Sequence, residues 1–107
     1  MKIQKFSPDG TCILDIDGRS LVEAMEERIN FMRMFCRQSI EDAGLDQTTQ
    51  SNAIAGIYES ERCDSIKSYI SDCRNEYLRC KALILASASN DEADAVQFVT
   101  PSKPKAL

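Results

Sequence analysis

The cysteines are the first candidates for chemistry, because the chain has five of them and no histidine. They are Cys12, Cys36, Cys63, Cys73 and Cys80. An odd number without a CxxC pair forms neither a disulfide framework nor a zinc ribbon. Cys73 and Cys80 are about 10 Å apart along a helix, too far for two ligands of one zinc ion. We expect thiols packed as apolar groups, with metal chelation across a dimer interface, or thiol-based regulation through Cys63, Cys73 or Cys80, as alternatives.

Carboxylate pairs are the next candidates. Asp72 and Glu76 stand at i and i+4, as do Glu23 and Glu27. Metal sites in helix bundles also need Glu-x-x-His ligands, and without histidine neither these nor Ser–His and Cys–His nucleophile pairs can form within one chain. The GxGxxG, GxxxxGK[ST] and HExxH motifs are also missing from the sequence. We therefore expect no enzyme activity, no cofactor, no metal and no small-molecule substrate.

The segment Asp15-Ile16-Asp17-Gly18 has the composition of a calcium-binding loop. If Gly18 held the loop glycine position of an EF-hand, the ligand positions would be Ile13, Asp15 and Ala24. Two of these side chains cannot bind calcium. We interpret the segment as an acidic strand end and turn.

Charge patterning argues against nucleic acid as a partner. The chain has 13 basic and 17 acidic residues and a formal charge of −4, whereas phosphate-backbone binding needs a basic surface. Arg37 and Glu41 are an opposite-charge pair at i,i+4. Arg33, Arg37 and Arg74 can still gather into a local basic patch after folding, but the helices are too long for a helix-turn-helix.

Length and hydropathy predict one domain without a membrane segment. The 107 residues weigh 12.0 kDa and are 43% apolar. No apolar run reaches the roughly 20 residues of a membrane helix, and residues 1–10 contain no apolar signal core. We expect a cytoplasmic protein.

The N-terminal part is typical of a β-hairpin over residues 1–18. A strand at 2–6 is followed by the turn sequence Ser7-Pro8-Asp9-Gly10 and a β-favouring run from Thr11. Ser20 and Glu23 then fit a capping box at the start of a helix over 19–44, which Gly44 ends in the left-handed conformation.

Two long helices carry apolar seams with alternating spacings of three and four. In the first helix the seam is Val22, Met25, Ile29, Met32 and Cys36, and a second row is Leu21, Ala24, Phe31 and Phe35. The helix over 61–90 has the seam Ile66, Ile70, Cys73, Tyr77, Cys80 and Ile84, with Tyr69 and Leu78 among its flanking positions.

Between and after these helices the pattern is less regular. Gly56 interrupts residues 45–60, which form a short separate helix or the bent first part of a long one. Residues 95–100 alternate and favour a strand, so we expect 91–99 to be a docked extended segment or strand, with a motif for a partner's groove as the alternative. Residues 100–107 are expected to be disordered.

The expected fold is mainly α, a small α+β domain over residues 1–99. An N-terminal β-hairpin precedes an antiparallel long-helix hairpin, or coiled-coil-like bundle, with a short or bent connecting helix and a possible C-terminal strand. The mixed Ile, Met, Cys and Tyr seams favour an irregular bundle over an extended rod.

The leading functional hypothesis is a non-catalytic helical protein–protein interaction module, such as an adaptor, assembly factor or small chaperone-like partner. We expect a homodimer through the apolar seams. The two seams and the second row together expose more apolar surface than the pairing of two helices can bury. The predicted interface residues are Leu21, Met25, Phe31, Met32, Phe35, Ile66, Ile70, Tyr77 and Ile84.

The alternative is a small acidic inhibitor or regulator of a larger enzyme or nucleic-acid-processing complex, of the kind found in phages and mobile elements. It would bind through charged residues and weaken in high salt, unlike an apolar interface. Its expected contact residues are Glu59, Glu61, Asp64, Asp91, Glu92 and Asp94.

Overall fold

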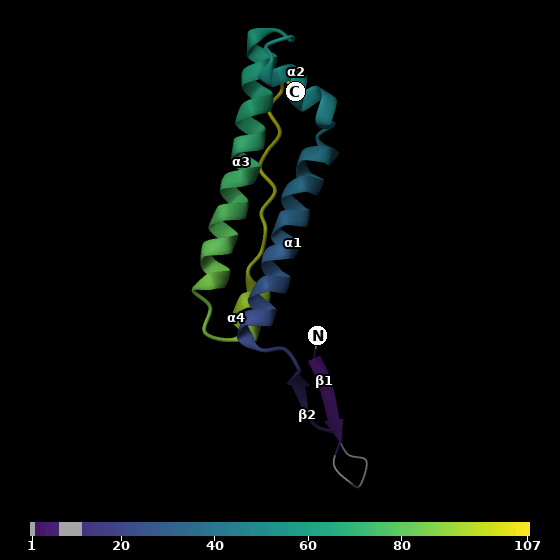
Figure 1. Cartoon of the computed structure of the whole chain (residues 1–107), viewed down its shortest axis with the longest axis vertical. Coiled ribbons are helices and arrows are strands. Elements are labelled where there is room, and N and C mark those ends of the chain that lie inside the picture. Colours follow the sequence, from purple (N-terminus) through teal and green to yellow (C-terminus); the bar gives the residue numbers. More distant parts are fainter. Residues whose placement is uncertain (1, 7–11) are drawn as a thin grey trace.

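Two long antiparallel helices dominate the computed structural model, which describes residues 2–6 and 12–107, with side chains from residue 17 onward (Figure 1). The long helices are α1 (Leu21–Asp42) and α3 (Ser60–Leu85). The short helix α2 (Gln47–Ile54) forms the corner between them, and α4 (Asn90–Ala95) lies at the opposite end of the pair. The prediction of a mainly helical fold is confirmed.

Two strands precede the helices. β1 (Lys2–Phe6) pairs antiparallel with β2 (Cys12–Asp17), in a register that sets Lys2 opposite Asp17. The predicted turn Ser7-Pro8-Asp9-Gly10 lies outside the described residues.

Local sequence signals set the ends of the first two helices. Both hydrogen bonds of the predicted capping box are present: the Glu23 N–H donates to Ser20 Oγ at 3.1 Å, and the Ser20 N–H donates to Glu23 Oε1 at 3.3 Å. Gly44 follows the end of α1 with φ of 80°. Gly56 has φ of 72° and follows α2. A positive φ interrupts the helical backbone, and few residues other than glycine tolerate it. Gly56 therefore separates α2 from α3, and the 45–60 connection contains a short helix of its own.

The core lies between the helices as two clusters of buried side chains. The lower cluster is Ile29, Met32, Cys80, Ile84 and Ala93. The upper cluster is Leu45, Ala53, Ile66, Tyr69 and Cys73. Most of these residues hold the predicted seam positions. Val22 differs, because it lies at the first turn of α1 and is 62% exposed.

The C-terminal part differs from prediction. The last long helix ends at Leu85 instead of residue 90, because Ser89 caps the new helix α4 by accepting the Glu92 N–H at 3.1 Å. Residues 91–95, expected to be extended, are therefore helical.

Residues 96–107, called the tail from here on, run back along the α1–α3 pair without forming the possible C-terminal strand (Figure 1). Instead of pairing with a strand, the tail backbone accepts hydrogen bonds from side chains of the helices. Arg28 Nη2 donates to the Val96 carbonyl at 2.7 Å, and Arg79 Nη2 donates to the Gln97 carbonyl at 3.0 Å.

The far end of the tail, residues 100–107, was expected to be disordered and instead follows the helix pair. The Thr100 and Ser39 hydroxyls are 3.4 Å apart, and Lys103 Nζ donates to the Asp42 carbonyl at 3.3 Å. Leu107 packs against the upper cluster. Composition favoured disorder, but Val96, Phe98 and Leu107 pack, partly buried, against the two core clusters.

Candidate interaction surface

Most of the predicted interface lies inside the single chain. Met32, Ile66 and Ile84 are completely buried. Met25, Ile70 and Tyr77 are half-buried and pack on the two core clusters, and Leu21 is also half-buried. Only Phe31 and Phe35 are exposed. The two seams therefore pack against each other within one chain. A contact with another molecule has to use apolar residues outside the seams.

The tail and α4 cover part of the apolar surface of the two long helices. Val96 and Phe98 pack on the lower cluster, and the Phe98 ring centroid lies 6.2 Å from that of Phe35. Ala24, from the second row of α1, is fully buried. The sequence pattern of the helices contains no signal that a later segment covers this row.

Large apolar side chains nevertheless stay exposed where α1 meets the tail. Phe31 is 39% exposed, Met34 60% and Phe35 43%. These three residues of α1 are called the tail-side face. Beside Phe35 lies a hollow of about 370 Å³, lined by Phe35, Gln38, Ser39, Asp42, Gln97, Phe98 and Thr100. The face thus offers projecting apolar groups next to a recess.

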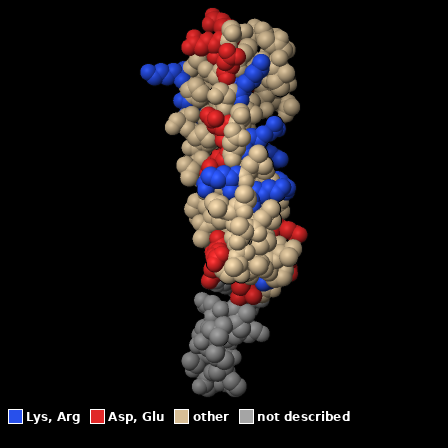
Figure 2. Space-filling view, turned by 90° about the vertical axis from the view of Figure 1, so that its left-hand side faces the viewer, with Lys and Arg blue, Asp and Glu red and all other residues tan. Residues whose placement is uncertain are grey.

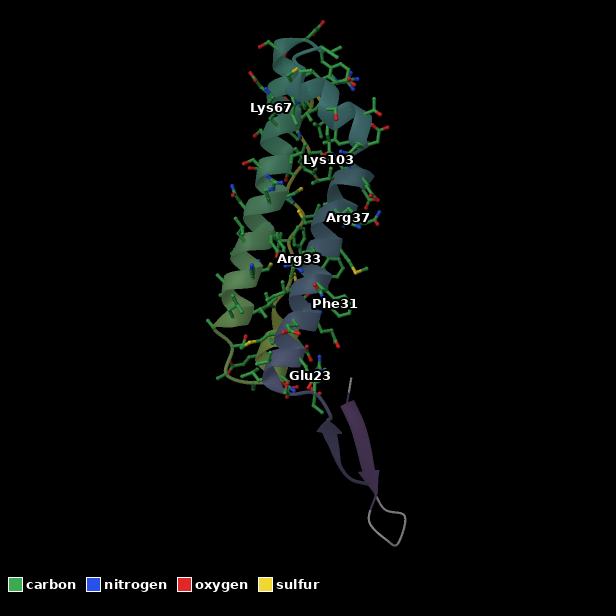
Figure 3. The ribbon with its side chains drawn as sticks, in the orientation of Figure 1. Glu23, Phe31, Arg33, Arg37, Lys67 and Lys103 are labelled. Carbon is green, nitrogen blue, oxygen red and sulfur yellow. The ribbon has the colours of Figure 1, made fainter. Side chains whose placement is uncertain are left out.

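A second concave surface lies between α1, α3 and the α2 corner, and it contains no tail residue. This pocket, called the open groove, has a volume of about 520 Å³ and is lined by Arg33, Cys36, Arg37, Ile40, Glu41, Leu45, Asp46, Gln47, Gln50, Ile70 and Arg74. The basic patch considered from the sequence, Arg33, Arg37 and Arg74, is therefore brought together here. Figure 3 shows Arg33 reaching from α1 toward α3, with Arg37 one turn further along α1.

The acidic residues of the alternative hypothesis do not form one surface. Glu59, Glu61 and Asp64 lie at the start of α3, whereas Asp91 to Asp94 lie on α4 beyond its end. A 26-residue helix is about 39 Å long. In Figure 2 acidic side chains accordingly gather near both ends of the helical part.

The thiols are mostly enclosed. Cys63, Cys73 and Cys80 are buried and Cys36 is half-buried in the open groove. Burial raises the pKa of the Cys36, Cys73 and Cys80 thiols, although the Arg74 charge opposes this at Cys36. Of the three cysteines proposed for thiol-based regulation, Cys73 and Cys80 are thus held as protonated core groups, and Cys63 is enclosed in the protein.

Sequence reasoning missed two polar arrangements, of which the first is buried and the second is partly exposed. Tyr69, treated as a flanking position, is fully buried, and burial raises its pKa to about 12. Arg19 bridges Asp17 at 2.6 Å, Asp94 at 2.7 Å and Glu27 at 2.9 Å, so that it ties the end of β2 to α1 and α4. These bonds to Arg19 lower the pKa of Asp17 and Asp94. The distance in sequence between residues 19 and 94 left no local signal.

Two further observations concern the described part of the chain alone. Its helices include none with the length and apolarity needed to cross a membrane. Within the same residues, no group of three or more Cys, Asp or Glu side chains is arranged to hold a metal ion.

Comparisons of the chain with protein-family models, with curated proteins and with solved structures find no match.

Proposed function

We propose that this protein is a non-catalytic protein–protein interaction module that associates with a second copy of itself through the tail-side face. The observation that carries the proposal is the exposure of Phe31, Met34 and Phe35 on α1, beside a hollow lined by Phe35 and Phe98. A cluster of large exposed apolar side chains next to a recess is typical of a contact surface.

The position of the face on α1 favours a second copy as its partner. α1 spans residues 21–42, so Phe31 and Phe35 lie on either side of its midpoint. A two-fold axis near residue 33 would place Phe31 of one copy against Phe35 of the other, and the same contact would repeat on the far side of the axis. Packing the two α1 helices in this way would bring each Phe31 toward the other copy's hollow.

Charge does not oppose this contact. The hollow itself includes one carboxylate, Asp42, whereas the exposed side chains of the face are uncharged. Apolar burial supplies about 25 cal/mol per Å² and is insensitive to simple salt screening. We therefore expect the dimer to persist in high salt, unlike association through acidic residues.

The test is light scattering after size exclusion, in reducing buffer, at two protein concentrations and at low and high salt. Met34→Ser and Phe31→Ser should shift the protein to monomer, because both side chains are exposed and are not part of either core cluster. The matched control is Leu78→Ser, which removes a 53% exposed leucine from α3 and should leave the dimer intact. A wild-type monomer at every concentration, or equal dissociation by the Leu78 variant, would contradict the proposal.

We propose the cytoplasm as the compartment. Cys36, Cys63, Cys73 and Cys80 are free thiols in the structure, which fits a reducing environment. Titration of thiols in protein purified without reductant checks this: recovery of these four as thiols supports the proposal, and disulfide-linked material opposes it.

A further inference from the structure

The open groove has the composition of an anion-binding site with an apolar floor. Ile40, Leu45 and Ile70 line it together with the guanidinium-bearing residues Arg33, Arg37 and Arg74. Leu45 is 2% exposed and belongs to the upper core cluster, which holds the floor in place. A ligand that fits this groove has negative groups that meet the arginines and an apolar group between them.

The arginines of the groove are not neutralised within the described part of the chain. Arg37 and Arg74 have neither a hydrogen bond nor a salt bridge to a described residue, and the predicted Arg37–Glu41 pair is not formed. Among the described residues, Arg33 bonds only to neutral groups: Nη1 donates to Asn30 Oδ1 at 2.8 Å and Nε to the Tyr77 hydroxyl at 3.1 Å.

Other arginines of this acidic chain show that such pairing is available. Arg19 contacts three carboxylates and Arg79 is paired with Glu76 at 2.6 Å. In a protein with a net charge of −4, three guanidinium groups without carboxylate partners around one pocket mark a place where an external anion gains charge-assisted hydrogen bonds.

We propose that the open groove binds a short acidic segment of a partner protein, with carboxylates at Arg33, Arg37 and Arg74 and an apolar side chain over Ile40 and Ile70. A polyanion is disfavoured, because Glu41 and Asp46 also line the groove and would repel a continuous phosphate backbone. Asp46 accepts the Thr49 N–H at 2.7 Å, which lowers the pKa of Asp46 and keeps it charged.

The tail shows how this helix pair holds an extended chain. On the tail side, Arg28 and Arg79 donate to backbone carbonyls of Val96 and Gln97 while Phe98 packs between the helices. The open groove presents the same combination of arginines and apolar floor without a tail residue among its lining. This binding site is separate from the tail-side face and does not depend on dimer formation.

The test is an NMR titration of the full chain, isotope-labelled at arginine, with the capped peptide acetyl-Glu-Glu-Leu-Glu-amide. We expect saturable shifts of the Arg37 and Arg74 Nε–H signals that weaken in high salt. The peptide acetyl-Gln-Gln-Leu-Gln-amide should bind at least about tenfold more weakly, since each lost charge pair is worth a factor of that order. Equal binding of the two peptides would overturn the proposal.

Variants locate the site. Arg37→Gln and Arg74→Gln should each weaken binding of the acidic peptide by about tenfold. Arg62→Gln is the matched control, because Arg62 is an exposed arginine of α3 whose guanidinium stacks on Tyr58 at 4.0 Å, outside the groove. Circular dichroism checks that each variant is folded. The two single variants are interpreted separately, so that one misfolded variant does not decide the result.

Other probes decide the ligand class. Inorganic phosphate and a single-stranded oligonucleotide are titrated under the same conditions. Tighter binding of phosphate or of the oligonucleotide to the same arginines would show that the ligand is a phosphate compound and would overturn the proposal of an acidic protein segment. Shifts at Arg62 as large as those at Arg37 and Arg74 would show only unspecific attraction to surface charge, which would also overturn it. The Phe31→Ser variant should bind the acidic peptide as the wild type does, so that failure of the dimer and failure of this site are distinguishable.

Discussion

The carboxylate of Glu76, in the middle of α3, accepts the backbone N–H of Val99 at 2.7 Å. The same Oε2 atom forms a salt bridge with Arg79 at 2.6 Å, and Arg79 in turn donates to the Gln97 carbonyl at 3.0 Å. One ion pair on α3 thus holds the tail through both a donor and an acceptor of its backbone. This contact fastens the tail over one side of the helix pair, while the open groove on the other side stays accessible.

Replacement of Glu76 should loosen the tail in a pH-dependent way. The hydrogen bonds from Arg79 and from the Val99 N–H hold the pKa of Glu76 at about 2, below its ordinary value of 4.5. Because the pKa is lowered on folding, the stabilisation is complete above about pH 5 and is lost as the pH falls through 4.5 toward 2. Glu76→Gln should cost about 1–3 kcal/mol near neutral pH.

The measurement is the unfolding free energy of both proteins across that pH range, with the Val99 amide followed by NMR. The difference between wild type and Glu76→Gln should shrink at the acidic end. A difference that stays constant with pH would show that the carboxylate charge does not hold the tail.

Two neighbouring residues of α3 test the closure of the seams within one chain. Ile84 is completely buried in the lower cluster, whereas Leu85 is 55% exposed. Ile84→Ala should destabilise the protein by about 2–5 kcal/mol because it leaves a cavity, and Leu85→Ala by about 0.5 kcal/mol or less. Chemical denaturation of both variants measures this. Similar losses at the two positions would mean that the seam does not face α1 as described.

Thiol reactivity should separate the cysteines. Cys36 is half-buried in the open groove, and Cys63, Cys73 and Cys80 are buried. Since burial raises the pKa of Cys36, Cys73 and Cys80, little thiolate exists at neutral pH. A disulfide reagent should therefore modify Cys36 first, and the buried thiols should react only at the rate of unfolding.

The experiment uses a Cys12→Ser background, because the Cys12 side chain lies outside those described, and mass spectrometry identifies the modified residue. Denaturant should expose all four thiols equally. Rapid modification of Cys73 or Cys80 in the native protein would restore the hypothesis of regulation through these thiols.

The sequence by itself determined the features that depend on neighbours along the chain. Ser20 and Glu23 form a capping box because they are three residues apart, and Gly44 ends α1 because of its own backbone freedom. Spacing of three and four residues likewise placed Ile66 and Ile84 on one apolar seam, since helix geometry alone places such residues on one face.

Only the tertiary structure decided what covers the two sides of the helix pair. Nothing near Phe35 predicts that Phe98 packs on it, and the alternation of residues 95–100 is equally compatible with a strand. Arg33 and Arg74 share a groove only because α1 and α3 pack in one particular register. Contacts between residues 40 to 75 positions apart depend on the relative placement of whole elements, which no local pattern encodes.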